Sequence, residues 1–188
     1  MKKKIAIVAG GDSSEHEVSL RSAAGILSFM DAERYDCRIV AQRGQSMHVL
    51  DGERQYPVNL HDFSYEVDGK RQTFDFAYIT IHGTPGENGI LQGYFDLIGL
   101  PYSTSGVLVE ALTFNKFALN NYLRSLPGIH VSDSLMVRRG QTLPTPEEVV
   151  ERVGLPCFIK PNAGGSSFGV SKVKALEEVI PAIHKAMD

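Results

Sequence analysis

The sequence lacks an excess of charge of either sign and lacks any long apolar run. Its formal net charge is −3, with 22% charged residues of both signs. It therefore has no basic field of the kind that binds nucleic acids or anionic membranes. No stretch approaches the roughly 20 apolar residues that a membrane-spanning helix needs. We expect neither a nucleic-acid nor a membrane partner, and look instead to small molecules or another protein.

Cysteine is also scarce, with Cys37 and Cys157 each inside a β-rich apolar segment. Buried free thiols are favoured over a disulfide. The start, Met1–Lys4, resembles the first part of an export signal, but the apolar run at 5–9 is too short for the second part and meets two glycines. We expect a first β-strand there and, with two free thiols, a reducing cytoplasmic location.

The first part of the chain alternates strand and helix signals, with turn residues at Asp51-Gly52 and Asp68-Gly69 between short alternating pieces. This pattern predicts an α/β fold with a doubly wound, mostly parallel sheet and hairpins on one sheet edge. The expected strands are Ile5–Val8, Tyr35–Ala41, Met47–Leu50, Gln55–Val58 and Phe74–Ile81. Two apolar helix faces are expected, one formed by Leu20, Ala23, Ala24 and Leu27 and the other by Leu91, Phe95 and Ile98.

A domain boundary is expected near two helical stretches, at about 105–112 and 115–126, which Pro127-Gly128 ends. We assign residues 1–112 to an N-terminal α/β domain and residues 113–188 to a linker helix and a second, α+β domain. The expected elements of this second part are strands at 135–137, 157–160 and 170–173, a helix that opens at Thr145-Pro146-Glu147, and a helix from Ala175.

The first candidate site is the segment 10–17, where a parallel strand ends and a helix begins, the usual ligand position in open α/β sheets. Glu15 adds a carboxylate in the first helical turn, which the helix dipole keeps charged and which suits a substrate ammonium. Alternatively the segment is only a capped helix start, since Ser14 and Glu17 have capping-box spacing. A dinucleotide fingerprint is disfavoured, because the third glycine is missing and the second strand ends without an acid at 40–42.

The second candidate site is the segment 82–89, again between a buried strand and a helix. Because the carboxyl ends of parallel strands share one sheet edge, we expect it beside the loop that carries Glu15. His82 is then placed to polarise or orient a carboxylate. The alternatives are a structural histidine and residues Glu87 or Asn88 that merely cap the next helix.

The third candidate site is the glycine- and serine-rich segment 160–169, which joins two short expected strands. Successive backbone N–H groups in such a turn form an anion-binding nest, and Lys160 adds a point charge that suits a triphosphate. It is not a Walker A loop, because the lysine precedes the glycines and no helix follows at once. The alternative is a flexible hairpin turn. Lys116, taken alone, is typical of a solvated helix lysine.

Motifs along the chain, taken in order, resemble those of D-alanine–D-alanine ligases, which belong to the ATP-grasp superfamily. The resemblance runs nearly the whole length. The motifs are GGDSSEHEVSL at 10–20, IHGTPGENGILQG at 81–93, LPYSTSGV at 100–107, NK at 115–116 and IKPNAGGSSFGVSKV at 159–173.

The resemblance implies a pre-ATP-grasp domain, followed by part of an ATP-grasp domain. It implies that ATP phosphorylates the carboxylate of a first D-alanine and that the amine of a second D-alanine attacks the acyl phosphate, for peptidoglycan synthesis. We also expect a homodimer through the N-terminal domain. Phosphoryl transfer of this kind needs positioning and charge neutralisation more than a covalent catalyst.

The roles of individual residues are implied by the matching motifs. Glu15 would bind the ammonium of the first D-alanine, His82 would lie near its carboxylate, and Ser166 would orient the loop and a neighbouring tyrosine over that substrate. The residues implied to contact ATP, by their side chains or by backbone amides over the γ-phosphate, are Lys116, Lys160, Gly165, Ser166 and Ser167.

Some acids that are common in the family are replaced here, by Asn115, Gly164 and Asn88, and none of these is an implied ligand. Family members continue beyond residue 188 with the Asp, Glu and Asn that bind Mg²⁺. We therefore expect no metal ligand in this chain, and no ligase activity from its 188 residues alone.

Other functions stay open at this point. The same chemistry would serve a D-alanine–D-lactate type ligase or another ATP-grasp carboxylate ligase. A non-catalytic dimerisation or binding fragment is a different class, supported by the apolar helices around 91–98 and 107–112. A nucleotide-dependent oxidoreductase is disfavoured by the failed fingerprint.

Overall fold

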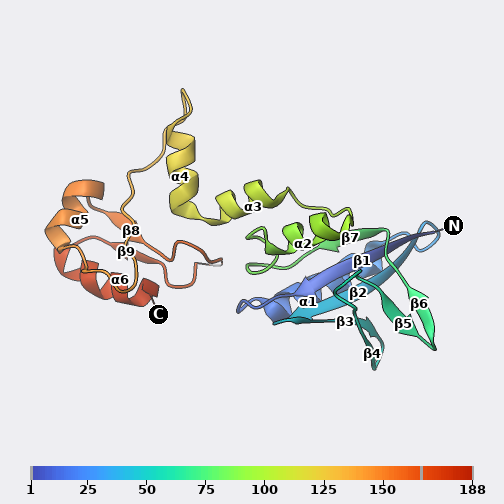
Figure 1. Ribbon diagram of the computed structural model, residues 1–188. Coiled ribbons are helices and arrows are strands. Elements are labelled where there is room, and N and C mark those ends of the chain that lie inside the picture. Colours follow the sequence, from blue (N-terminus) through green and yellow to red (C-terminus); the bar gives the residue numbers. More distant parts are fainter. Residues whose placement is uncertain (1, 166, 188) are drawn as a thin grey trace. The chain divides into compact units, whose positions relative to one another are not determined.

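The computed structural model describes residues 2–165 and 167–187. The chain divides into two compact units, residues 1–111 and 112–188 (Figure 1). The elements from the start of the chain to the helix that leads into the second unit are β1 (Lys3–Gly10), α1 (His16–Phe29), β2 (Tyr35–Arg43), β3 (Ser46–Asp51), β4 (Arg54–Pro57), β5 (Tyr65–Val67), β6 (Lys70–Gln72), β7 (Phe76–Ile79), α2 (Ile90–Ile98) and α3 (Val107–Phe114).

The first unit is built on a five-stranded sheet with the order β4-β3-β2-β1-β7. Strand β1 runs parallel to both β2 and β7, whereas β3 and β4 form an antiparallel hairpin at one edge. The predicted α/β fold with a parallel centre and a hairpin edge is confirmed. The second hairpin, β5 and β6, forms a separate two-stranded sheet, so only one of the expected hairpins extends the main sheet.

The two faces of the sheet are covered by different helices. Along β1, Ala6 and Val8 pack in one cluster with α2, whereas Ile7 and Ala9 pack in another with Ala23 of α1. Successive side chains of a strand point to opposite faces. Because all four of these strand residues are fully buried, the sheet is doubly wound, as predicted.

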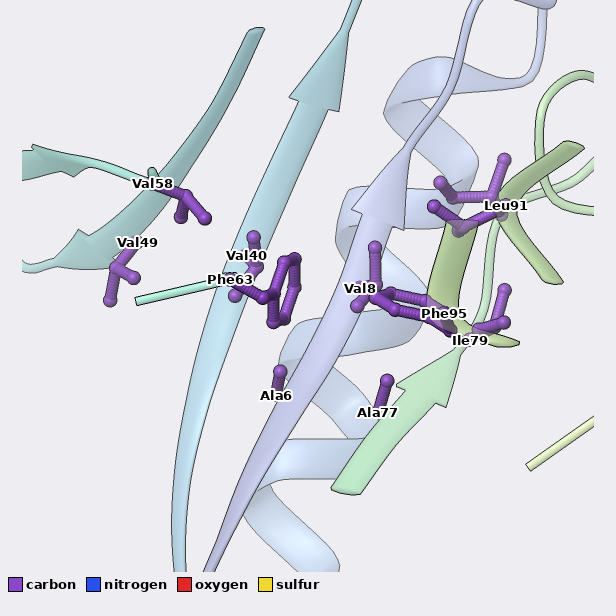
Figure 2. Close-up of a cluster of buried hydrophobic side chains, with 11 residues drawn as sticks. Ala6, Val8, Val40, Val49, Val58, Phe63, Ala77, Ile79, Leu91 and Phe95 are labelled. Atoms are coloured by element: carbon purple, nitrogen blue, oxygen red, sulfur yellow. The ribbon is translucent and has the colours of Figure 1, made fainter. Parts of the chain in front are cut away.

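An aromatic residue in the loop before β5 closes the α2 side of the sheet. Phe63 is only 2% exposed, and its ring centroid lies 5.1 Å from that of Phe95 in an edge-to-face arrangement. Figure 2 shows both rings on the same face of the sheet as Val8 and Val40. Phe63 adopts a φ of 55°, an uncommon conformation for a bulky residue. Its burial in the core stabilises that conformation.

The buried face of α1 agrees with the prediction in part. Leu20 and Ala23 pack on the sheet as predicted, together with Ser19 and Ile26, whereas Ala24 and Leu27 are exposed. Apolar periodicity includes Ala24 and Leu27 because they are apolar, and leaves out Ser19 because it is polar. The prediction was wrong for Ala24 and Leu27, because the buried face of α1 includes the polar Ser19, which is fully buried.

The second unit contains a small antiparallel sheet of two strands packed against helices. Helix α5 begins as predicted, with Pro at its first position and a capping box between Thr145 and Glu148. The expected strand at 135–137 is wrong: this stretch has no regular structure, although Val137 packs on the core. The elements are α4 (Lys116–Arg124), α5 (Pro146–Val153), β8 (Cys157–Ile159), β9 (Ser171–Val173), the 3₁₀ helix η1 (Leu176–Glu178) and α6 (Val179–Met187).

No helix within 2–165 or 167–187 has the length and apolar character needed to cross a membrane.

Candidate functional site

Two loops meet at the carboxyl edge of the first unit's sheet, where β1 and β7 end side by side. The backbone N–H of Asp12 donates to the carbonyl oxygen of Thr84 at 2.9 Å. The hydroxyl of Ser13 donates to the carbonyl oxygen of His82 at 2.7 Å. The predicted convergence of the segments 10–17 and 82–89 is therefore confirmed.

Glycines allow this close approach of the two loops. Gly11 has a φ of +93°, and a Cβ added to it would lie 2.5 Å from Cγ2 of Ile81. A larger residue at position 11 would push the loops apart. Gly86 has a different role, because a Cβ added to it would lie 2.6 Å from both the Cβ and the carbonyl oxygen of Ile81 at the start of its own loop.

Glu15 is the N-cap residue directly before α1, and it is partly buried. Within the described residues, no side chain of the predicted Ser14–Glu17 capping box caps this helix start. Instead, the backbone N–H of Glu15 donates to the Ser13 hydroxyl at 3.2 Å, and its carbonyl oxygen accepts from the N–H of Ser19 at 2.9 Å. The main chain of Glu15 is therefore held on both sides.

The loop after β7 is braced from within. Oε2 of Glu87 accepts from the backbone N–H of Gly83 at 2.7 Å, and Nδ2 of Asn88 donates to Oγ1 of Thr84 at 3.0 Å. The fully buried Gln92 donates from Nε2 to the carbonyl oxygen of Gly86 at 2.6 Å. These polar residues shape the loop, and His82 lies partly buried at its start.

Ser19 connects the helix to both strand ends. Its hydroxyl accepts from the N–H of Gly10 at 2.9 Å and donates to the carbonyl oxygen of Thr80 at 2.7 Å, and the residue is fully buried. Ser19→Ala leaves both groups unpaired, so we expect unfolding free energy to fall by about 1–3 kcal/mol. Chemical denaturation measures this.

The matched control for that substitution is Ser22→Ala on the same helix. Its hydroxyl donates to the carbonyl oxygen of Val18 at 3.0 Å, at an exposed position. We expect a change of within about 0.5 kcal/mol there. Equal effects of the two substitutions would contradict the bridging role of Ser19.

The second group of predicted residues lies in the second unit. Lys160 follows β8 directly, and Lys116 is the first residue of α4. Asn162 brings α4 and the glycine loop together: its carbonyl oxygen accepts from the N–H of Lys116 at 3.2 Å, and its Oδ1 accepts from the N–H of Phe117 at 2.9 Å. Nζ of Lys116 donates to the carbonyl oxygen of Gly164 at 2.8 Å. Lys116 is therefore attached to the loop rather than a solvated surface lysine.

A cavity of about 670 Å³ lies beside this loop, within the second unit. That volume falls in the range typical of small-molecule sites. The wall has an apolar part, with Met136, Val137, Phe158 and Phe168. The predicted residues that line it are Lys116, Lys160, Gly165 and Ser167, and Ser166 lies outside the described residues. Cationic and apolar surfaces together suit a ligand with an anionic part and an apolar part.

Neither cysteine forms a disulfide, so the prediction of free thiols is confirmed. Cys37 is only partly buried, whereas Cys157 is buried and lines the cavity. Burial raises the pKa of the Cys157 thiol. A thiol with a raised pKa stays protonated at neutral pH and is a poor nucleophile.

Over the part of the chain that the structure describes, no group of three or more His, Cys, Asp or Glu side chains could hold a metal ion. The residues present therefore do not form a Mg²⁺ site of the carboxylate type.

Sequence reasoning missed Ser13, Gln92 and Asn162. Ser13 was hidden by the neighbouring Ser14, whose spacing to an acid matched a capping box. Gln92 bonds back to Gly86 in the loop directly before its own helix, but apolar periodicity gives no weight to a buried polar residue. The partner of Asn162 is the start of a helix that the sequence does not show to be adjacent. The site residues themselves divide between the units, with Glu15 and His82 in the first and the lysines and glycine loop in the second.

The paired loops on an α/β sheet, followed by a glycine-serine hairpin loop flanked by lysines, place the chain in the ATP-grasp class, whose ligases are its structural neighbours. The sequence profile described as "D-ala D-ala ligase N-terminus" matches residues 4–105, and that described as "D-ala D-ala ligase C-terminus" matches residues 123–188. The chain belongs to the D-alanine–D-alanine ligase family.

Individual relatives agree with this assignment. A D-alanine–D-alanine ligase of Phocaeicola vulgatus is 60% identical over 190 residues, covering all of this chain and 58% of the relative. The structure of the D-alanine–D-alanine ligase from Coxiella burnetii superposes with a TM-score of 0.84 at 27% identity, over 99% of this chain and 60% of that one. The VanG D-Ala:D-Ser ligase from Enterococcus faecalis gives 0.80 at 30% identity, over 100% and 60%. The chain thus spans about three fifths of the length of these relatives.

Proposed function

We propose that the complete protein containing this chain joins two D-alanine molecules with ATP through an acyl phosphate, for peptidoglycan synthesis. The observation that carries the proposal is the meeting of the Glu15 and His82 loops at one sheet edge, in a member of this ligase family. The relatives are named D-alanine–D-alanine ligases.

Glu15 and His82 serve the first D-alanine in this proposal. The Glu15 carboxylate binds the ammonium group, and His82 lies near the carboxylate that is phosphorylated. Support comes from the shared bracing of the two loops, in which Ser13 contacts both residues. A carboxylate for the ammonium end and an imidazole for the carboxylate end of a small amino acid supply positioning, which is a large part of what phosphoryl transfer requires.

The second unit serves ATP in this proposal. Lys116 and Lys160 contact the phosphates, and the backbone amides around Gly165, Ser166 and Ser167 cover the γ-phosphate. The cavity lined by both lysines and by apolar side chains supports this assignment. Ser166 also orients the loop over the substrate. Mg²⁺, which would neutralise charge on the phosphates, stays a prediction for residues outside this chain.

The test is phosphate release by the complete protein with ATP, Mg²⁺ and D-alanine, compared with the 188-residue chain under the same conditions. We expect turnover by the complete protein and none by the chain alone. Absence of D-alanine-dependent release from the complete protein would remove the proposed function. Turnover by the short chain would refute only its predicted inactivity.

A D-serine or D-lactate acceptor is the second candidate, because VanG, a D-Ala:D-Ser ligase, superposes over the whole chain. An acceptor panel of D-alanine, D-serine and D-lactate with the complete protein separates these activities. Another ATP-grasp carboxylate ligase would show turnover with none of the three acceptors.

We further propose that the protein is a homodimer through its first unit, in a cytoplasmic location where thiols stay reduced. The proposed limit between the substrate-binding domain and the ATP-grasp part lies between residues 112 and 113.

The proposed dimer surface lies on α2 and α3, where large apolar side chains are exposed: Ile90 by 60%, Leu97 by 84% and Leu108 by 77%. This surface, here called the α2/α3 face, differs from the inward-facing Leu91.

Leu97→Glu places a charge in the α2/α3 face, so we expect it to convert the dimer to a monomer. Light scattering over a wide concentration range measures the mass. Phe29→Glu is the matched control, because Phe29 is 91% exposed on α1, which covers the opposite face of the sheet. A monomeric unmodified protein, or an unchanged mass for Leu97→Glu, would contradict the proposal.

A further inference from the structure

The hydroxyl group of Ser13 lies between the two loops of the first unit. It donates to the carbonyl oxygen of His82 at 2.7 Å and accepts from the backbone N–H of Glu15 at 3.2 Å. A serine hydroxyl has one proton to donate, and here that proton is directed at a residue 69 positions away. Glu15 and His82 are thus connected through a single oxygen atom.

A helix start by itself does not require this arrangement. A serine that only shapes the first turn accepts from a nearby N–H, and the bond to Glu15 provides that. The bond from Ser13 to His82 is additional. Ser14, the next residue, is exposed and shows how a serine at this turn is placed without such a role.

Packing around Ser13 leaves no space for the loops to move closer. Gly83 has a φ of +76°, and a Cβ added to it would lie 3.0 Å from Cβ of Ser13 and 3.4 Å from its Oγ. A second hydrogen bond joins the two loops, from the N–H of Asp12 to the carbonyl oxygen of Thr84 at 2.9 Å. The contact between the loops is therefore close, and its spacing depends on small residues.

We propose that Ser13 is a positioning residue that sets the spacing between Glu15 and His82, and hence the fit of the first D-alanine. This inference rests on the proposed function. Ser13 acts through the main chain of the two residues, and does not itself contact the substrate. Loss of the hydroxyl leaves the side chains of Glu15 and His82 present but removes the hydrogen bonds that connect their main chains.

Ser13→Ala in the complete protein tests the inference. Displacing a positioned group by about 1 Å can cost up to about 100-fold in rate, so we expect KM for D-alanine at saturating ATP to rise by about 10- to 100-fold. We expect KM for ATP at saturating D-alanine to stay within about twofold, because the lysines belong to the other unit. Ser14→Ala, the matched control, should leave both constants unchanged.

Gly83→Ala provides an independent variant that retains the Ser13 hydroxyl. The added methyl group presses on Ser13 from the other loop and alters the same spacing. We expect the same selective rise in KM for D-alanine. If Ser13→Ala has a large effect and Gly83→Ala has none, Ser13 contacts the substrate directly and the positioning role is wrong. If Ser13→Ala fails to fold, Gly83→Ala decides.

Hydrogen exchange of the Glu15 amide in the 188-residue chain gives a readout without activity. We expect faster exchange in Ser13→Ala and no change in Ser14→Ala, and equal exchange would overturn the inference. An unmodified complete protein without D-alanine turnover would remove the proposed function and this inference together. Normal turnover with unchanged constants in Ser13→Ala would remove the inference alone.

Discussion

Glu15→Gln in the complete protein is expected to lower kcat/KM for D-alanine by roughly 30- to 1,000-fold. The substitution keeps the size of the side chain and removes the charge that holds the substrate ammonium. Charge-assisted hydrogen bonds and partly buried charge pairs are worth about 2–4 kcal/mol, which corresponds to that range. Steady-state phosphate release over a series of D-alanine concentrations measures the loss.

Glu17→Gln is the matched control for this substitution. Glu17 lies in the first turn of the same helix, two residues away, and its side chain is exposed. It carries the same charge near the same helix dipole, so a general effect of charge on α1 would appear in both variants. We expect Glu17→Gln to retain activity within about twofold. Similar activity of Glu15→Gln and the unmodified protein would exclude Glu15 as the ammonium-binding residue.

Phe63→Ala is expected to lower the unfolding free energy of the first unit by about 3–5 kcal/mol, through lost burial and the cavity left behind. Phe63 is 2% exposed and contacts the rings of Phe74, Tyr94 and Phe95. Domains of ordinary size are stable by only about 5–15 kcal/mol, so this is a large fraction. Urea unfolding followed by circular dichroism measures it in a chain that has no tryptophan.

The control for Phe63→Ala is Phe29→Ala, which removes the same side chain where it is 91% exposed. A change of within about 0.5 kcal/mol is expected there. The two free thiols then report each unit separately, since Cys37 belongs to the first and Cys157 to the second. Phe63→Ala should accelerate labelling of Cys37 under mild denaturant and leave Cys157 unchanged. Equal midpoints for the two alanine variants would contradict the core role of Phe63.

Much of the fold followed from residue patterns that are local. The apolar run that became β1 and the glycines after it predicted a strand ending at a ligand loop, and the segment 82–89 had the same form. Parallel strands end at one edge, so the meeting of the two loops could be predicted without a structure. That prediction depended on the parallel pairing of β1 with β7, which the tertiary structure shows.

The errors have physical causes that a local pattern does not contain. The stretch 135–137 has strand-forming residues, but a strand requires a hydrogen-bonded partner, and among residues 2–165 and 167–187 it forms no ladder. The face of α1 was only half right, because Ser19 is buried through bonds to backbone groups of β1 and the β7 loop. Burial of a polar residue depends on partners, and periodicity counts only apolar ones.

The sequence by itself determined the class of fold, the free thiols and the sheet edge that carries Glu15 and His82. Tertiary structure alone decided which hydroxyls and amides hold that edge together. Ser13 and Ser19 bond to residues 69 and 61 positions away, and Asn162 accepts from the N–H of Phe117 in the first turn of α4, 45 positions before it. The neighbouring sequence does not reveal whether a loop serine or asparagine bonds to a distant segment. Its role is set by the partner that folding brings within about 3 Å.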